Sequence, residues 1–163
     1  DKVERKCLNL SGLNDSSKLT SEFKFVDSDD FFTFLYNTMA FEIFAKTSLK
    51  YKTAMDDFHN LLKFFKSKGI AVDLVSVERG NSKPATLFFL SREKCKLDTL
   101  RFLNDYEKVW DDYQIVITAD PYIIETKRTR RKLFKIKTPQ NKHLTGGIEV
   151  ENLQEILNIL TNG

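Results

Sequence analysis

The chain has 163 residues, of which 41% are hydrophobic and 30% are charged, so it is long enough for one domain with a substantial core. Only 6 glycines and 3 prolines are present, which excludes a linker or low-complexity chain, and 2 cysteines exclude a disulfide framework. A net charge of +3 is too small to indicate nucleic-acid binding by itself.

Residues 1–22 read as a polar N-terminal extension in which residues 7–10 could form a short strand, and residues 23–163 read as a single domain. The run "EFKFVD" at 22–27 predicts a strand, because it is short, apolar and aromatic and stops at an acidic turn. From residue 31 to about residue 68 the pattern is helical. Its second half begins with acids, carries Lys near its end and is followed by Gly69, the start and stop signals of a complete helix.

The rest of the chain alternates apolar runs with a helical segment. Four runs read as further strands, at residues 70–76, 85–91, 114–120 and 132–139. Residues 96–113 have a helical period, and residues 148–160 predict a short strand followed by a closing helix with Asn152 at its N-cap. Strands that alternate with helices predict an α/β fold in which helices cover both faces of a parallel sheet.

Two of these predicted strands, the first and the fourth, end in aspartate, at Asp27 and Asp120. In open α/β sheets the ligand crevice lies beyond the carboxyl ends of the strands, so we expect both carboxylates near a ligand. The three acids Asp27, Asp29 and Asp30 have a simpler interpretation too. Carboxylates at a helix N-terminus accept hydrogen bonds from its unpaired amides and interact favourably with the helix dipole.

The apolar strand followed by Asp-x-Asp in "FKFVDSD" resembles the first motif of the haloacid-dehalogenase-like phosphatases. "GIAVDLVS", which ends in Ser76, resembles their second motif, Lys94 or Lys96 resembles the third, and "IVITAD", which ends in Asp120, resembles the fourth. Ser91 is a rival to Ser76. The resemblance covers about residues 23–160 and implies a three-layer, Rossmann-like fold with little or no cap.

By this resemblance the chain would be a Mg²⁺-dependent phosphomonoesterase acting on a nucleotide or a nucleic-acid end. Asp27 would be the nucleophile, Asp29 the acid and base, Ser76 a phosphate contact and Lys96 a charge-neutralising group. Asp27, Asp29 and Asp120 would hold Mg²⁺. Asp30 and Phe31 depart from the residues that the family usually has there, so a catalytically impaired member is the alternative.

The run "KRTRRKLFKIK" at 127–137 has seven basic residues and no acid. Such a run is usually a solvated loop or a charged edge strand. It would also suit the phosphates of a nucleic acid, with contacts from the residues that lie at its start: Lys127, Arg128, Arg130, Arg131 and Lys132. The alternative function is therefore a non-catalytic binding module, of the phage or viral regulator type, that contacts DNA, RNA or a polymerase.

The location expected from the sequence is cytoplasmic. The charged N-terminus lacks the apolar stretch of a signal peptide, and no apolar run approaches the ~20 residues that cross a bilayer. We therefore expect a phosphorylated small molecule, a nucleic acid or a nucleic-acid-processing protein as partner, and no membrane.

Overall fold

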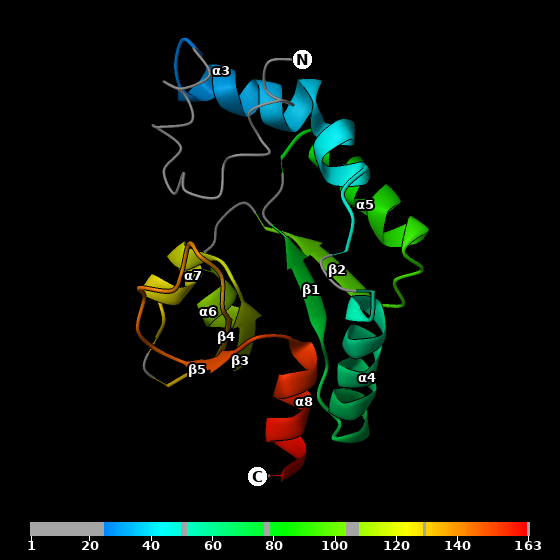
Figure 1. The fold of residues 1–163 in the computed structure, drawn as a ribbon, viewed down its shortest axis with the longest axis vertical. Helices are drawn as coiled ribbons and strands as arrows, with labels where there is room; N and C mark the ends of the chain where they lie inside the picture. The colour runs from blue at the N-terminus through cyan, green and yellow to red at the C-terminus, as the bar shows by residue number, and fades with distance from the viewer. Residues whose placement is uncertain (1–24, 50–51, 77–78, 104–107, 129, 163) are drawn as a thin grey trace.

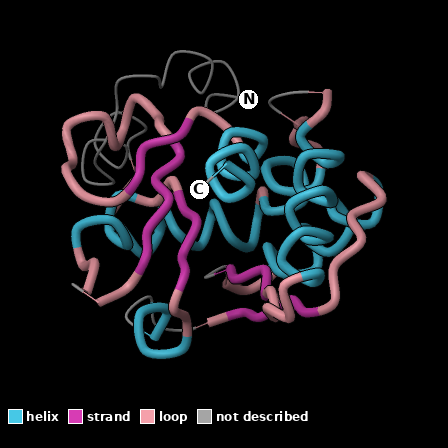
Figure 2. The backbone as a smooth tube through the Cα atoms, turned by 90° about the horizontal axis from the view of Figure 1, so that it is seen from below, coloured by secondary structure: helices cyan, strands magenta, loops and turns pink. Residues whose placement is uncertain are grey.

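The computed structural model describes residues 25–49, 52–76, 79–103, 108–128 and 130–162. Within them the protein is a mixed α/β structure, which confirms the expected class (Figure 1). One small sheet pairs β1 (Asp73–Ser76) with β2 (Thr99–Phe102). The other has the order β3-β4-β5, formed by Ile115–Thr118, Lys132–Ile136 and Ile148–Val150. All pairings are parallel, and Figure 2 shows the strands in two separate groups.

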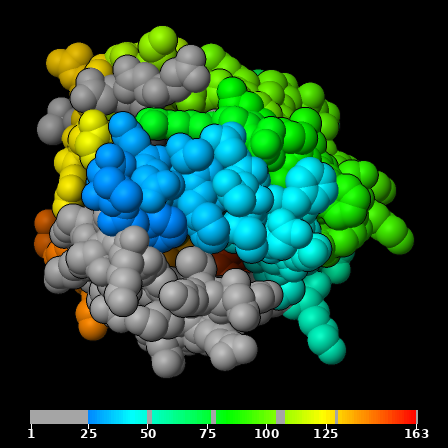
Figure 3. All heavy atoms as spheres, turned by 90° about the horizontal axis from the view of Figure 1, so that it is seen from above, coloured from blue at the N-terminus to red at the C-terminus, as the bar shows by residue number. Residues whose placement is uncertain are grey.

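Helices between residues 28 and 67 confirm the helical prediction for this half of the chain. They are α3 (Ser28–Thr33), the π-helical segments η2 (Phe34–Thr38) and η3 (Phe41–Ala45), and α4 (Ala54–Ser67). Gly69 follows α4 with a φ of +68°, a left-handed conformation that glycine adopts without steric cost. In Figure 1, α3 to η3 and α5 (Ser82–Arg92) lie beyond the end to which β1 points, and Figure 3 shows residues 25–49 on that upper face.

The three-stranded sheet buries apolar side chains on both of its faces. On one face a cluster forms with α6 (Lys108–Asp112) and α7 (Pro121–Glu125), from Leu103, Val109, Trp110, Val116, Ile123, Ile124 and Leu133. On the other face the cluster joins α4 to α8 (Leu153–Asn162), from Leu61, Phe65, Phe134, Val150 and Ile156. Neighbouring residues of β4 therefore enter opposite clusters, as the alternation of side chains along a strand requires.

Two predictions between residues 85 and 113 are wrong. Residues 85–91 are helical, within α5, and not a strand. Pro84 stands in the first turn, where its missing N–H costs nothing, and no helix breaker interrupts the run after it. Residues 99–102 form β2 instead of continuing a helix, since Thr99 and Leu100 pair with Asp73 and Leu74 of β1.

The strand expected at residues 22–27 is not present in its described part. Residues 22–24, like the expected extension 1–22, lie outside the described residues. Residues 25–27 are irregular, and Asp27 is the N-cap of α3. The alternative interpretation of the acidic cluster, a helix N-terminus, is therefore what the structure shows there.

The C-terminal third contains the elements predicted from the sequence, although its strands are shorter than expected. The predicted strands at 114–120 and 132–139 correspond to β3 and β4, and residues 148–160 contain β5 and most of α8. Asn152 accepts a hydrogen bond from the Glu155 amide at 3.0 Å, as an N-cap residue does. No helix in the described part of the chain is long and apolar enough to cross a membrane.

Candidate functional site

A cavity of about 300 Å³ lies between β1 and β3, and it is the best-defined concave feature that joins predicted site residues. Ser76, the last residue of β1, and Asp120, two residues after β3, both line it. The carboxyl ends of neighbouring parallel strands are where α/β proteins bind ligands. The structure thus brings together the residues that resemble the second and fourth motifs.

Asp120 is fixed by the start of α7. Its carboxylate accepts hydrogen bonds from the amides of Tyr122 at 2.9 Å and Ile123 at 3.3 Å, while its own amide donates to the Thr118 hydroxyl at 3.0 Å. Pro121 begins the helix, which suits a residue without an N–H. These bonds give the Asp120 carboxylate a defined orientation beside the cavity. Asp120 is only partly buried.

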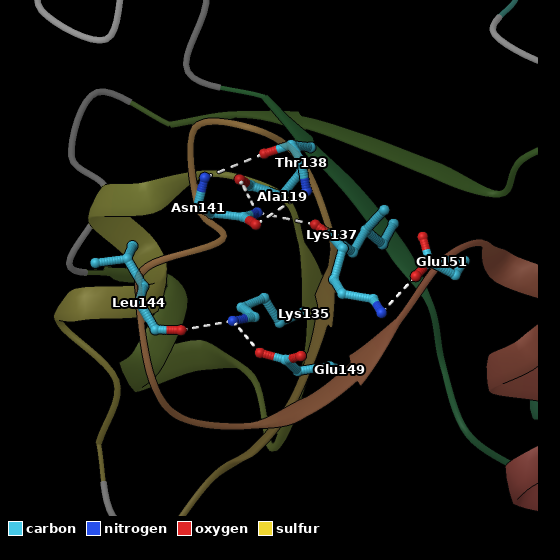
Figure 4. A network of polar contacts seen from close by, with 9 residues as sticks. Ala119, Lys135, Lys137, Thr138, Asn141, Leu144, Glu149 and Glu151 are labelled. Atoms are coloured by element: carbon cyan, nitrogen blue, oxygen red, sulfur yellow. Dashed lines mark hydrogen bonds and ion pairs between the residues drawn. The ribbon is translucent and has the colours of Figure 1, made fainter.

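The backbone before Asp120 is held by Asn141, a fully buried residue (Figure 4). The Asn141 amide group donates to the carbonyl oxygens of Ala119 at 2.9 Å and Ile136 at 2.8 Å, and its side-chain oxygen accepts from the Thr138 amide at 3.0 Å. One side chain thereby joins the exit of β3 to the exit of β4. Sequence reasoning missed this residue, for which only the turn-forming run "TPQN" gave a local signal.

A polar cluster at the opposite end of the cavity joins the two sheets. The Tyr113 hydroxyl donates to Asp73 at 2.7 Å and accepts from Arg101 at 2.8 Å, and Arg101 also donates to Asp112 at 3.0 Å. Burial and the hydrogen bond to Asp73 raise the pKa of Tyr113. These four residues, which we call the Tyr113 clamp, connect β1 and β2 to the segment before β3.

Asp27 and Asp29 do not line this cavity. The Asp27 carboxylate accepts a hydrogen bond from the Asp30 amide at 2.8 Å, and the Asp30 carboxylate accepts from the Val26 amide at 3.3 Å. Both bonds close a local turn at the start of α3, and all three acids are exposed. Figure 1 shows α3 well separated from α7, so the described structure does not assemble Asp27 with Asp120.

The lysines predicted for the third motif lie at the other end of the sheet. Lys94 and Lys96 precede β2, so they lie near its amino end, whereas Ser76 is at the carboxyl end of the parallel strand β1. The Lys96 amide donates to His59 of α4 at 2.8 Å. Ser91, the rival to Ser76, is exposed near the end of α5.

A different lysine lies at the carboxyl end of the strands. Lys83, in the first turn of α5, has its ammonium 5.5 Å from the ring centroid of Phe102, the last residue of β2. The turn before α5 also contacts the helices beyond β1, since the Asn81 amide donates to the Asn37 side chain at 3.4 Å. No motif in the sequence singles out Lys83.

The basic segment, defined as residues 127–137, is mostly paired with protein groups. Arg128 forms an ion pair with Asp111, and Arg131 donates to the carbonyl oxygens of Trp110 and Asp111. Lys137 forms an ion pair with Glu151, which raises the pKa of Lys137. Lys132 lies over the Phe134 ring at 5.1 Å, and β4 is the central strand, so the expectation of an edge strand is wrong.

Lys135 is fully buried although it carries a charge. Its ammonium contacts the Glu149 carboxylate and the Leu144 carbonyl oxygen, each at 2.5 Å (Figure 4). The hydrogen bond from Lys135 lowers the pKa of Glu149. A buried charge needs such partners, so this pair joins β4 to β5 and to the loop that precedes β5. Lys127 is half-buried and Arg130 is exposed.

The described residues contain no group of three or more His, Cys, Asp or Glu side chains that could hold a metal ion. Mg²⁺ is commonly held by only one or two carboxylates, with water and substrate phosphate completing its shell. Asp120 supplies one such carboxylate at the cavity, and Thr118 and Ser76, which carry hydroxyl groups, line the same cavity. The donors fit a hard cation that binds together with a phosphate.

A scan against protein-family models and searches of curated proteins and of solved structures found no match to this chain.

Proposed function

We propose that the chain is a Mg²⁺-dependent phosphomonoesterase with a haloacid-dehalogenase-like, three-layer fold, and that it acts on a nucleotide or a nucleic-acid end. The observation that carries the proposal is the shared cavity of Ser76 and Asp120 at the carboxyl ends of β1 and β3. Helices on both sides of the three-stranded sheet support the layered arrangement. The helices beyond β1 would form a small cap over the cavity.

The roles follow from the chemistry of each side chain. The Asp27 carboxylate would attack phosphorus and form an aspartyl-phosphate, while Asp29 would give its proton to the leaving oxygen and later accept one from water. The Ser76 hydroxyl would donate a hydrogen bond to a phosphate oxygen. Asp120 would hold Mg²⁺, which when bound neutralises the charge of the phosphate group.

The same proposal requires Asp27 to approach the cavity from the start of α3. The carboxylates of Asp27 and Asp30 are exposed, and the hydrogen bonds that they accept among the described residues come only from the Asp30 and Val26 amides, so no described long-range bond holds them at α3. A carboxylate brought next to Ser76 and Asp120 would add the second acidic ligand that Mg²⁺ sites often contain.

Hydrolysis of an aryl phosphate with and without Mg²⁺ tests the proposal. We expect Asp27→Asn and Asp120→Asn each to lower kcat/KM by roughly a factor of 100 or more, and Ser76→Ala by roughly a factor of 10. Asp111→Asn is the matched control, because Asp111 is exposed and pairs with Arg128 away from the cavity. Turnover retained in Asp120→Asn, or turnover independent of Mg²⁺, would contradict the proposal.

The alternative function, a non-catalytic nucleic-acid or polymerase-binding module, is less well supported by the geometry. Carboxylates or carbonyl oxygens already engage Arg128, Arg131 and Lys137 of the basic segment. Phosphate binding through this segment would have to displace them. A salt-dependent shift of labelled DNA by a chain without phosphatase turnover would favour the alternative.

A further inference from the structure

A second cavity, of about 310 Å³, lies between α4, α8 and the two sheets, and we call it the apolar cavity. All of its lining residues are apolar except Asp73 and Tyr113. These two bond each other, since the Tyr113 hydroxyl donates to the Asp73 carboxylate at 2.7 Å. The apolar cavity shares lining residues of β1 and β3 with the first cavity, but Ser76, Thr118 and Asp120 line only the first. Its chemistry is therefore that of a hydrophobic site.

Helix α4, which forms one wall of the apolar cavity, is held on two sides. Toward the two-stranded sheet, Lys66 forms an ion pair at 2.6 Å with Asp98, the residue before β2, and His59 accepts a hydrogen bond from the Lys96 amide at 2.8 Å. Toward the three-stranded sheet, α4 packs against α8 in the cluster that includes Phe134 (Figure 1). Closing the cavity by moving α4 would break one of these sets of contacts.

The volume of the apolar cavity and the residues that line it indicate the kind of molecule that fits it. Protein interiors are close-packed, and few of their voids are larger than a water molecule. A cavity of about 150 Å³ lined by Leu, Ile and Phe stays dry and binds benzene. The apolar cavity has the same kinds of lining residue and roughly twice that volume, so a molecule of two fused rings suits it. Phe58, Phe65 and Tyr113 line it as well, and aromatic rings pack favourably against one another.

We propose that the apolar cavity binds a small, uncharged aromatic molecule of one or two rings, independently of the proposed phosphatase site. Asp73 already accepts from Tyr113 and lies 3.6 Å from the Arg101 guanidinium, so an ionised ligand would be buried without a counter-charge of its own. Ile70 lines the cavity and is 40% exposed, which places the entrance beside the turn that follows α4.

Titration of the full chain with quinoline near neutral pH, followed by calorimetry, tests the proposal. Quinoline is an uncharged molecule of two fused rings, and N-methylquinolinium is the same ring system with a fixed positive charge. We expect saturable binding of quinoline and at least tenfold weaker binding of N-methylquinolinium, because an ion gains little from an apolar site. If quinoline does not bind, or if both compounds bind equally well, the proposal is wrong.

Two matched substitutions locate the binding. Val72 lines only the apolar cavity and packs on the α4 and α8 side, whereas Val75 lines only the first cavity and packs on the opposite side. We expect Val72→Phe, which adds a ring to the apolar cavity, to weaken quinoline binding at least tenfold, and Val75→Phe to change it less than threefold. Equal effects of the two substitutions would overturn the assignment.

Nuclear magnetic resonance of methyl groups in the unsubstituted chain gives a test that does not depend on the folding of a variant. On saturation with quinoline, we expect the largest shifts at methyl groups of Leu61, Ile136 and Leu153, which line only the apolar cavity. Val109 and Val116 line only the first cavity and serve as the control. Shifts that are as large at these two valines would refute binding in the apolar cavity.

Discussion

At the scale of single residues, Asn141 has the most demanding position near the candidate site. It is fully buried and holds the carbonyl oxygens of Ala119 and Ile136, so its loss leaves two buried acceptors without a donor. We expect Asn141→Ala to lower the free energy of unfolding by about 2–3 kcal/mol, measured by urea denaturation. Asn158→Ala, on the exposed face of α8, should change it by less than ~0.5 kcal/mol. Equal effects of the two substitutions would show that the Asn141 bonds contribute little.

The residue scale also shows what an acidic motif can and cannot reveal. The sequence correctly places Asp27 and Asp120 where regular elements begin or end. An Asp-x-Asp run after an apolar stretch serves equally as a catalytic motif and as a helix cap, because both use carboxylate oxygens to accept hydrogen bonds. In the structure Asp27 is the N-cap of α3, and Asp120 is likewise the N-cap of α7. Asp120 differs in that it also lines the cavity.

At the scale of elements, the turn between β1 and α5 depends on Gly80. Its φ is +53°, and an added Cβ would lie 2.1 Å from the side-chain oxygen of Asn37 on η2. Gly69 has a φ of +68° but no atom within 4 Å of the same position. Gly80→Ala therefore incurs both backbone strain and a clash, and Gly69→Ala only the strain.

We expect Gly69→Ala to lower the free energy of unfolding by about 1 kcal/mol and Gly80→Ala by about 1–2 kcal/mol, because the Asn37 side chain must rotate away and lose its hydrogen bond from the Asn81 amide; thermal or urea denaturation measures both. The comparison isolates the contact between the turn and Asn37, because both glycines have a positive φ. If the two variants are equally stable, that contact does not constrain the turn.

Periodicity and end signals predicted most of the elements that carry them. Helix α4 has acids at its start and Gly69 after its end, and the apolar runs predicted as strands at residues 114–120 and 132–139 contain β3 and β4. Residues 85–91 gave the wrong answer because apolar side chains surround α5 and remove the helical period. β2 was missed because its pairing with β1 is a tertiary contact that overrides the helical pattern of its neighbours.

Part of the candidate site was also predictable from local sequence patterns. Strand ends place Ser76 and Asp120 near one another once the strands are parallel, so local patterns sufficed for these two residues. The prediction that Lys96 lies at the site was wrong because its position depends on β2, the strand that was not predicted. Asn141 and Tyr113 act through loops whose spatial partners no local pattern specifies.

At the scale of the whole molecule, the Tyr113 clamp connects the two sheets at one end of the space between them. We expect Tyr113→Phe to lower the free energy of unfolding at pH 7 by about 1 kcal/mol, since one half-buried hydroxyl with two hydrogen-bond partners is lost. The folded pKa of Tyr113 is raised, so the clamp's contribution is present below the unfolded value of ~10 and is lost as the pH rises through the folded pKa.

Denaturation of both chains from pH 7 to pH 11 measures this difference. The stability gap between the unsubstituted chain and Tyr113→Phe should close above pH ~10, because a tyrosinate cannot donate to Asp73. Asp98→Asn, which removes an exposed ion pair with Lys66, serves as the control and should give a small gap without that alkaline change. A gap that persists unchanged to pH 11 would exclude a role for the hydroxyl.

The pairing of the basic segment has a consequence for how this surface responds to acid. Asp111, Glu149 and Glu151 mask the charges of Arg128, Lys135 and Lys137, and masking by a carboxylate ends when that carboxylate takes up a proton. Because Lys135 lowers the pKa of Glu149, the ion pair between Glu149 and Lys135 persists to a lower pH than the ordinary pKa of a glutamate would allow. Acid therefore leaves more uncompensated positive charge along this segment than it has near neutral pH, where carboxylates pair with its cations.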